Sequence, residues 1–132
     1  MAGTITQTVK GHGKDSTLQY TLSCTGDASD GTFPNTALGF ERQLQGYRLE
    51  AMETTPGSVT PDSYTVKVED ENGFDMLGGV GASRSTSDTE RVIPTVMTGM
   101  SGTVPVNGTS TVKITGNNNV GATLTINLWF SK

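Results

Sequence analysis

An acidic segment followed by a glycine run is the part of the sequence with the clearest capacity for chemistry. From Tyr64 to Arg84 the chain reads YTVKVEDENGFDMLGGVGASR. Carboxylates placed around a glycine bind calcium in EF-hand loops, and glycine runs bind phosphate through backbone N–H groups. A cation site and a phosphate site are therefore the first two hypotheses to weigh.

The acidic segment departs from the calcium-loop pattern. An EF-hand loop has Asp or Asn at its first, third and fifth positions, Gly at the sixth and Glu at the twelfth. With Gly73 at the sixth position, Val68 is the first and Gly79 the twelfth. The Asn-Gly pair predicts a type I′ hairpin turn instead. We predict no metal centre, and a weak ion site near Asp70 and Asp75 is left open.

The glycine run does not match a nucleotide site. GGVGAS lacks the Lys-Ser/Thr ending of a P-loop, and Gly79 and Gly81 are not followed by the third glycine of a dinucleotide fingerprint. The next residues, SRSTSDTE, lack the apolar periodicity of a helix whose N-terminus could hold phosphate. We attribute the glycines to backbone freedom and close packing against a neighbour, and expect no cofactor.

Candidate catalytic groups are few. His12 is the only histidine, and KGHGKD places it in a glycine-flanked turn without a nucleophile-elbow sequence nearby. Carboxylates for glycosidase chemistry are available, but no pair stands out among Asp27, Asp30, Glu41, Glu50, Glu53, Asp62, Glu69 and Glu71. We predict that the protein is not an enzyme. A hydrolase with a carboxylate pair remains an alternative.

Composition limits the partners. The chain has 132 residues, which fits one domain spanning 1–132, and its nine Lys and Arg are scattered under a net charge of -4. Direct nucleic-acid binding is therefore not expected.

The start has no signal-peptide pattern and no apolar run is long enough to span a bilayer, so we expect synthesis in a cytoplasm, no secretion and no membrane partner. Cys24, the single cysteine, is expected to be a small buried side chain.

Alternation of apolar and polar residues at period two recurs along the chain and predicts strands. Seven strands are expected, in the ranges Thr4 to Val9, Thr17 to Thr25, Gly46 to Glu53, Ser63 to Asp70, Glu90 to Met97, Thr109 to Gly116 and Gly121 to Ser131. The short spacing between the predicted strands, and the Gly, Asn, Asp, Ser and Pro clusters that separate them, favour an all-β antiparallel sandwich of jelly-roll-like type. The last two strands are expected to form a C-terminal hairpin.

The alternation also predicts which side chains point inward. Ile5 and Val9 face inward in the first strand, and Tyr47, Leu49 and Ala51 in the third. Pro94 suits an edge position or a bulge, because it cannot donate to a strand ladder.

Two long irregular segments and one tryptophan are the candidate contact surfaces. Gly26 to Gln45 and Gly78 to Glu90 have loop composition, and loops of this length are usually either functional or disordered on their own. Trp129 is predicted on the outer face of the last strand, among Thr and Asn, where it is either covered by a long loop or a second sheet or open to contact a protein or a sugar. A hydrophobic content of 33% predicts a modest core that association would complete. The candidate partner-binding residues are Gly78, Gly79, Gly81, Arg84, Phe33, Phe40 and Trp129, and Met97 and Met100 could extend the surface.

The segment from Pro61 to Glu90 resembles a pattern in small virion proteins of tailed bacteriophages. That pattern comprises a P-x-x-Y-x-V strand, a D-x-x-G-x-D turn, a GG-x-G-A-x-R loop, a Ser/Thr stretch ending in an acid, and a C-terminal strand closing on an aromatic residue. The corresponding residues are Pro61, Tyr64, Val66, Asp70, Gly73, Asp75, Gly78, Gly79, Gly81, Ala82 and Arg84, followed by the ending from Asn119 to Phe130. The resemblance covers about half of the chain.

The resemblance implies an all-β, non-enzymatic virion subunit that binds other virion proteins in symmetric copies. We therefore expect a capsid decoration (cement) protein or a head–tail neck or tail accessory subunit, forming a homo-oligomer such as a trimer and located in the virion. The alternative is a carbohydrate-binding or host-receptor-binding sandwich in which Trp129 and either Tyr20 or Tyr47 stack on sugars.

Overall fold

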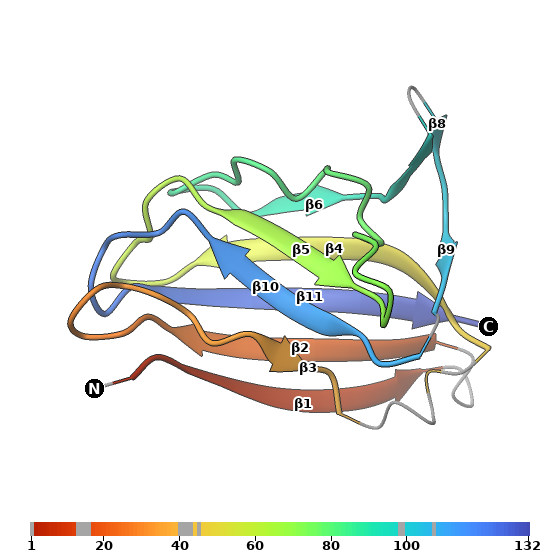
Figure 1. Ribbon diagram of the computed structural model, residues 1–132, viewed down its shortest axis with the longest axis horizontal. Coiled ribbons are helices and arrows are strands. Elements are labelled where there is room, and N and C mark those ends of the chain that lie inside the picture. The colour runs from red at the N-terminus through yellow and green to blue at the C-terminus, as the bar shows by residue number, and fades with distance from the viewer. Residues whose placement is uncertain (1, 13–16, 40–43, 45, 98–99, 107) are drawn as a thin grey trace.

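The computed structural model describes residues 2–12, 17–39, 44, 46–97, 100–106 and 108–132. In these residues the chain is nearly all β, and every pair of neighbouring strands is antiparallel. Two sheets form a sandwich-like fold, with the smaller one in front of the larger one in Figure 1. The prediction of an all-β antiparallel sandwich is confirmed.

The larger sheet contains the long strands. Its order is β1 (Thr4–His12), β2 (Thr17–Thr25), β11 (Thr123–Ser131), β4 (Arg48–Pro56) and β6 (Glu90–Val92), and β9 (Val104–Pro105) also pairs with β4. The smaller sheet has the order β3 (Thr36–Ala37), β10 (Thr111–Thr115) and β5 (Thr65–Glu69). A separate ribbon is formed by β7 (Thr95–Met97) and β8 (Met100–Ser101).

The core lies between the two sheets because each long strand buries alternate side chains. In β11 the residues from Leu124 to Phe130 are alternately buried and half-buried, and Leu124, Ile126, Leu128 and Phe130 are at most 2% exposed. The smaller sheet contributes Val66, Val68 and Val112, all fully buried, to the same cluster. The Phe130 ring packs edge-on against Tyr20 of β2, with centroids 5.6 Å apart.

The predicted C-terminal hairpin is wrong. β10 pairs with β3 and β5 in the smaller sheet, whereas β11 pairs with β2 and β4 in the larger one. The connection between them therefore crosses from one layer to the other, with Gly116 and Gly121 at positive φ. Alternation indicates which face of a strand is buried, but it contains no information about the pairing partner.

The inward orientation predicted for Ala51 is also wrong. In the pairing of β4 with β11, Leu49 lies opposite Phe130 and Ala51 lies opposite Trp129, so Glu50 is an extra residue in β4. Such a bulge reverses the alternation beyond it. Met52 consequently takes the buried position, and Ala51 joins the outer face.

The single strand predicted from Glu90 to Met97 is instead two short strands, β6 and β7. Pro94 lies between them and is not part of a ladder, although its carbonyl accepts a hydrogen bond from the Gly102 N–H at 2.9 Å. The structure has eleven strands among its described residues rather than seven. The additional ones, such as β3, β8 and β9, have two residues each, too few to show a period in the sequence.

The thiol of Cys24 gives a direct test of the core. Burial raises the pKa of Cys24 to about 12, and the side chain is 2% exposed on the inner face of β2. We expect no reaction of the native protein with a thiol reagent such as DTNB at pH 8, and rapid reaction in denaturant, because only the thiolate attacks. A Ser23→Cys variant places a second thiol on the opposite, exposed face of β2 and should react at once. Rapid native labelling of wild-type Cys24 would contradict the buried position.

Candidate interaction surface

Trp129 lies on the outer face of the larger sheet, as predicted. Its neighbours across the ladder are Gln19 of β2 and Ala51 of β4, and its side chain is half-buried. Ala51 is small, so it leaves one side of the indole open to residues on the next strand. The bulge at Glu50 is what places this small residue beside the tryptophan.

Arg91 of β6 uses that space. Its guanidinium carbon is 4.5 Å from the centroid of the Trp129 ring, a distance typical of a cation–π contact. Its Nη2 also donates to Oε2 of Glu53 at 3.0 Å, in an ion pair whose arginine side chain is 60% exposed. Because the pair is exposed, its contribution to stability is small, and its main effect is to orient the guanidinium over the ring.

The Glu53 carboxylate continues a chain of hydrogen bonds across the sheet. Its Oε1 accepts from Nδ2 of Asn127 at 3.2 Å, and Oδ1 of Asn127 accepts from the Thr21 hydroxyl at 2.7 Å and from Nε2 of Gln19 at 3.2 Å. The contacts therefore connect β6, β4, β11 and β2. We call the six residues that take part the outer-face cluster: Gln19, Thr21, Glu53, Arg91, Asn127 and Trp129.

The outer-face cluster has side chains of the kinds that occur in binding surfaces. It combines an amphipathic tryptophan ring with an oriented guanidinium, and both kinds of group are enriched at the centres of protein interfaces. Amide and hydroxyl groups surround them. The hydrogen bonds hold most of these side chains in place within the chain itself, and side chains ordered in this way have little rotamer entropy left to lose. Its single carboxylate, Glu53, already accepts from Arg91 and Asn127.

The segment from Gly78 to Glu90, predicted as a contact loop, folds back along β5. Before it, the Met76 N–H donates to the Val68 carbonyl at 2.7 Å. Further along, the Val66 N–H donates to the Gly81 carbonyl at 2.9 Å, and the Arg84 N–H to the Tyr64 carbonyl at 2.8 Å. The segment thus covers the outer edge of the smaller sheet.

The glycines of this segment are required by close packing. A Cβ atom on Gly81 would collide with the Val66 carbonyl oxygen, and one on Gly78 would collide with the Thr95 carbonyl oxygen. Gly78 and Gly79 also have positive φ, at 65° and 89°. Backbone carbonyls therefore fill the space beside two of the glycines, in agreement with the packing interpretation given above.

The carboxylate of Asp75 holds the beginning of the same segment. Its Oδ1 accepts from the N–H groups of Leu77 at 3.1 Å and Val68 at 3.3 Å, and its Oδ2 accepts from Gly79 N–H at 3.0 Å. Asp70 similarly accepts from the N–H of Phe74 at 3.1 Å. Both acids therefore stabilise turns.

The hairpin predicted at Asn-Gly is confirmed, but its turn type is not. Glu69 and Asp75 form an antiparallel bridge, and the Gly73 N–H donates to the Asp70 carbonyl at 3.0 Å. Gly73 has a φ of 80°, whereas Asn72 is not among the described residues with positive φ. A type I′ turn needs two such residues, so the turn is of another type.

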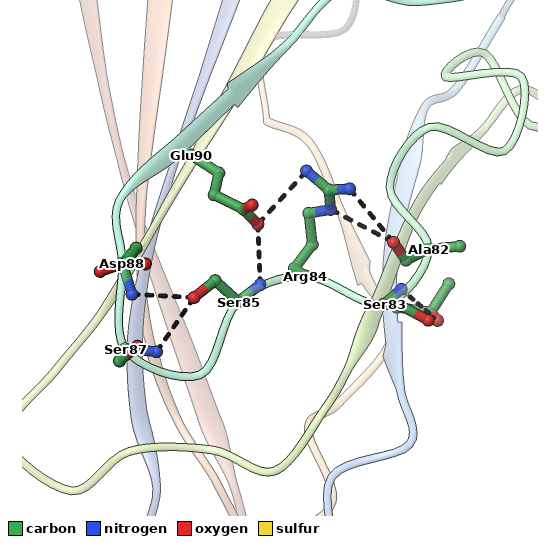
Figure 2. Close-up of polar contacts among 8 residues, drawn as sticks. Ala82, Ser83, Arg84, Ser85, Ser87, Asp88 and Glu90 are labelled. Atoms are coloured by element: carbon green, nitrogen blue, oxygen red, sulfur yellow. Dashed lines mark hydrogen bonds and ion pairs between the residues drawn. The ribbon is translucent and has the colours of Figure 1, made fainter.

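Arg84 and Glu90 close the end of the segment, as Figure 2 shows. Their side chains form an ion pair at 3.4 Å, and the Glu90 carboxylate also accepts from the Ser85 N–H at 2.7 Å. Within the turn, the Ser85 hydroxyl oxygen accepts from the Asp88 N–H at 2.9 Å. Since Arg91 follows Glu90, the segment leads directly into the outer-face cluster.

The other candidates are placed differently. Phe33 is 6% exposed and belongs to the core, so it does not supply the surface contact predicted for it. Phe40 lies outside the described residues. Met100 is 53% exposed, on the ribbon of β7 and β8. Tyr20 and Tyr47 are 0% and 4% exposed, so neither forms the predicted stacking platform with Trp129.

The sequence analysis identified Trp129 but missed the rest of the cluster. Arg91, Glu53 and Asn127 come from three strands, and each is an ordinary polar residue of an alternating pattern. Only the strand order β11-β4-β6 brings them together. No local signal in the sequence could have identified them.

Other kinds of site find no support in the described part of the chain. No group of three or more His, Cys, Asp or Glu side chains there is placed to hold a metal ion. No helix among the described residues is long and apolar enough to cross a membrane. Comparison with protein-family models, curated proteins and solved structures found no match.

Replacing Gly81 with alanine tests the packing of the glycine run. The added methyl group must displace the backbone of β5 at Val66, so we expect a loss of about 1–3 kcal/mol in the free energy of unfolding, measured with denaturant. Gly39→Ala is a matched control, because a Cβ there would meet only the Gln7 side-chain oxygen, at 3.5 Å. Equal stability of the two variants would contradict the close approach.

Quenching of the single tryptophan tests the Arg91 contact. Arg91→Ala uncovers one side of the Trp129 ring, so we expect a larger acrylamide quenching constant with a stability loss below about 1 kcal/mol. Arg48→Ala is the control, because Arg48 bonds to Thr103 instead. An unchanged quenching constant in Arg91→Ala would show that the guanidinium does not cover the ring.

Proposed function

We propose that the protein is a structural subunit of a tailed-bacteriophage particle and acts by binding other virion proteins. The role would be that of a capsid decoration protein or a head–tail neck accessory subunit, made in the host cytoplasm and retained in the virion. The resemblance of Pro61 to Glu90 to small virion proteins supports this class. The all-β fold is consistent with it.

The outer-face cluster is the observation that carries the proposal. It places a half-exposed tryptophan under an ion-paired arginine on a sheet face that is otherwise rich in Thr, Ser and Asn. Tyr, Trp and Arg are the residues most often found to dominate protein interfaces, whereas a largely uncharged polar surround excludes water without steering charged ligands. A second protein surface is the partner that fits this chemistry best.

The mechanism would be cementing. Each copy contributes a moderate contact through its outer-face cluster, and the symmetry of the particle repeats that contact many times. Repetition converts moderate single-site affinity into strong retention on the particle. No bond is made or broken in this role.

Mass spectrometry of purified particles tests the proposal. We expect the chain in intact virions, and we expect Trp129→Ala to lower its incorporation by at least tenfold, because truncation of a central aromatic residue commonly costs 2 kcal/mol or more, roughly a factor of thirty. Phe74→Ala is the matched control, since Phe74 is an aromatic residue 53% exposed and outside the cluster. Absence of the wild-type chain from intact virions would refute the assignment. Binding to a glycan array that is lost in Trp129→Ala would favour the carbohydrate-binding alternative.

A further inference from the structure

β1 is a long strand with one unpaired edge. It is nine residues long, lies at the end of the larger sheet and pairs with β2 through its whole length. Among the described residues no other segment forms a backbone hydrogen bond with it. Figure 1 shows β1 as the lower margin of the larger sheet. A row of N–H and C=O groups along this edge is thus available for pairing.

The other edges of the two main sheets are protected. β6 has three residues and is soon followed by Pro94, while β3 has two residues and is preceded by Pro34. The edge of β5 is covered by the folded segment that ends at Arg84. Short strands, proline and covering loops are the usual devices that prevent pairing with another chain. β1 is long and contains no proline, no described segment other than β2 pairs with it, and its one charged residue is Lys10.

The inner face of β1 indicates that its burial is incomplete. Ile5 and Val9 pack against the core but are only partly buried. Between them, the Gln7 amide donates to the Ala37 carbonyl at 2.9 Å and accepts from the Gly39 N–H at 2.8 Å. These two bonds hold β1 against the smaller layer, so the edge is already in position for a partner strand.

The residue types in β1 are similar on the two sides of Gln7. A strand with this symmetry can pair with a second copy of itself, so we take β1 of another chain as the partner strand. In an antiparallel pair centred on Gln7, Ile5 lies opposite the partner's Val9 and Thr6 lies opposite the partner's Thr8. The remaining pair is Thr4 with the partner's Lys10, so the two lysines lie at opposite ends and do not repel. Pairs of β-branched residues are favourable in this arrangement. In this pair the partly buried side chains of Ile5 and Val9 each gain an apolar neighbour from the partner strand.

We infer that two copies of the chain associate through β1, antiparallel about a twofold axis at Gln7, to form one sheet that is continuous across the dimer. Antiparallel edge pairing places the twofold axis perpendicular to the sheet, so both outer faces are on the same side. The dimer therefore presents two outer-face clusters side by side. This inference depends only on β1 and does not require the proposed role in a virion.

Charge substitutions at Thr6 and Thr8 test the dimer and its register. Both side chains are exposed on the outer face, so the changes leave the core intact. We expect the wild-type chain to sediment at twice its mass of 13.8 kDa. In Thr6→Lys/Thr8→Lys each new lysine opposes one from the partner, and we expect the dissociation constant to rise by about tenfold or more.

Thr6→Glu/Thr8→Lys is the matched control, because the same pairing then places opposite charges across the interface. We expect this variant to remain dimeric. Thr6→Lys/Thr8→Lys and Thr6→Glu/Thr8→Glu should each dimerise weakly alone, because like charges then face each other. A mixture of the two variants should form a heterodimer, because opposite charges face each other across its interface. A monomeric wild-type chain would overturn the inference. So would an oligomer of any size that the Lys/Lys substitution leaves unchanged. Since none of these assays involves phage particles, their outcome is independent of the virion proposal.

Discussion

The burial of one face of β11 between β2 and β4 is the constraint on which the rest of the structure depends. Its inward residues from Leu124 to Phe130 are almost fully inaccessible and form the centre of the core. The same alternation forces Asn127 and Trp129 outward, because successive side chains of a strand point to opposite faces. The strand that stabilises the sandwich therefore also supplies the centre of the proposed contact surface.

The bulge at Glu50 connects packing to the surface. Without the extra residue, Ala51 would point into the core and a large side chain would lie beside Trp129. With it, Met52 fills the core, and the small Ala51 leaves room for Arg91 to reach the indole ring. An irregularity in a single ladder thus positions a residue from the next strand. The backbone geometry makes room for the guanidinium over the ring, and the exposed ion pair with Glu53 orients it while contributing little to stability.

The residues from Pro61 to Glu90 have a clear structural role. Tyr64 and Val66 are buried, Asp75 accepts three backbone hydrogen bonds, and Gly81 packs directly on β5. The conformation of this segment gives its acids and glycines a structural reason: the acids accept backbone hydrogen bonds in turns, and two of the glycines lie against backbone carbonyls. In this chain these residues shape a turn and a covering loop, whereas the surface proposed for binding lies on the other sheet.

The sequence by itself determined the strand class, the buried face of most strands and the outward position of Trp129, because a period of two is a local property that a single strand displays. It did not determine that β10 and β11 belong to different sheets, that Ala51 faces outward, or that Phe33 is buried. Nor did it indicate that Arg91, Glu53 and Asn127 meet around Trp129, or that one edge of β1 has no backbone partner among the described residues. These features depend on which strands become neighbours and in what register, and such pairings join residues that are far apart along the chain. Only the tertiary structure decides them, since hydrogen-bonded backbones pair in many arrangements and the packing of the whole core selects one.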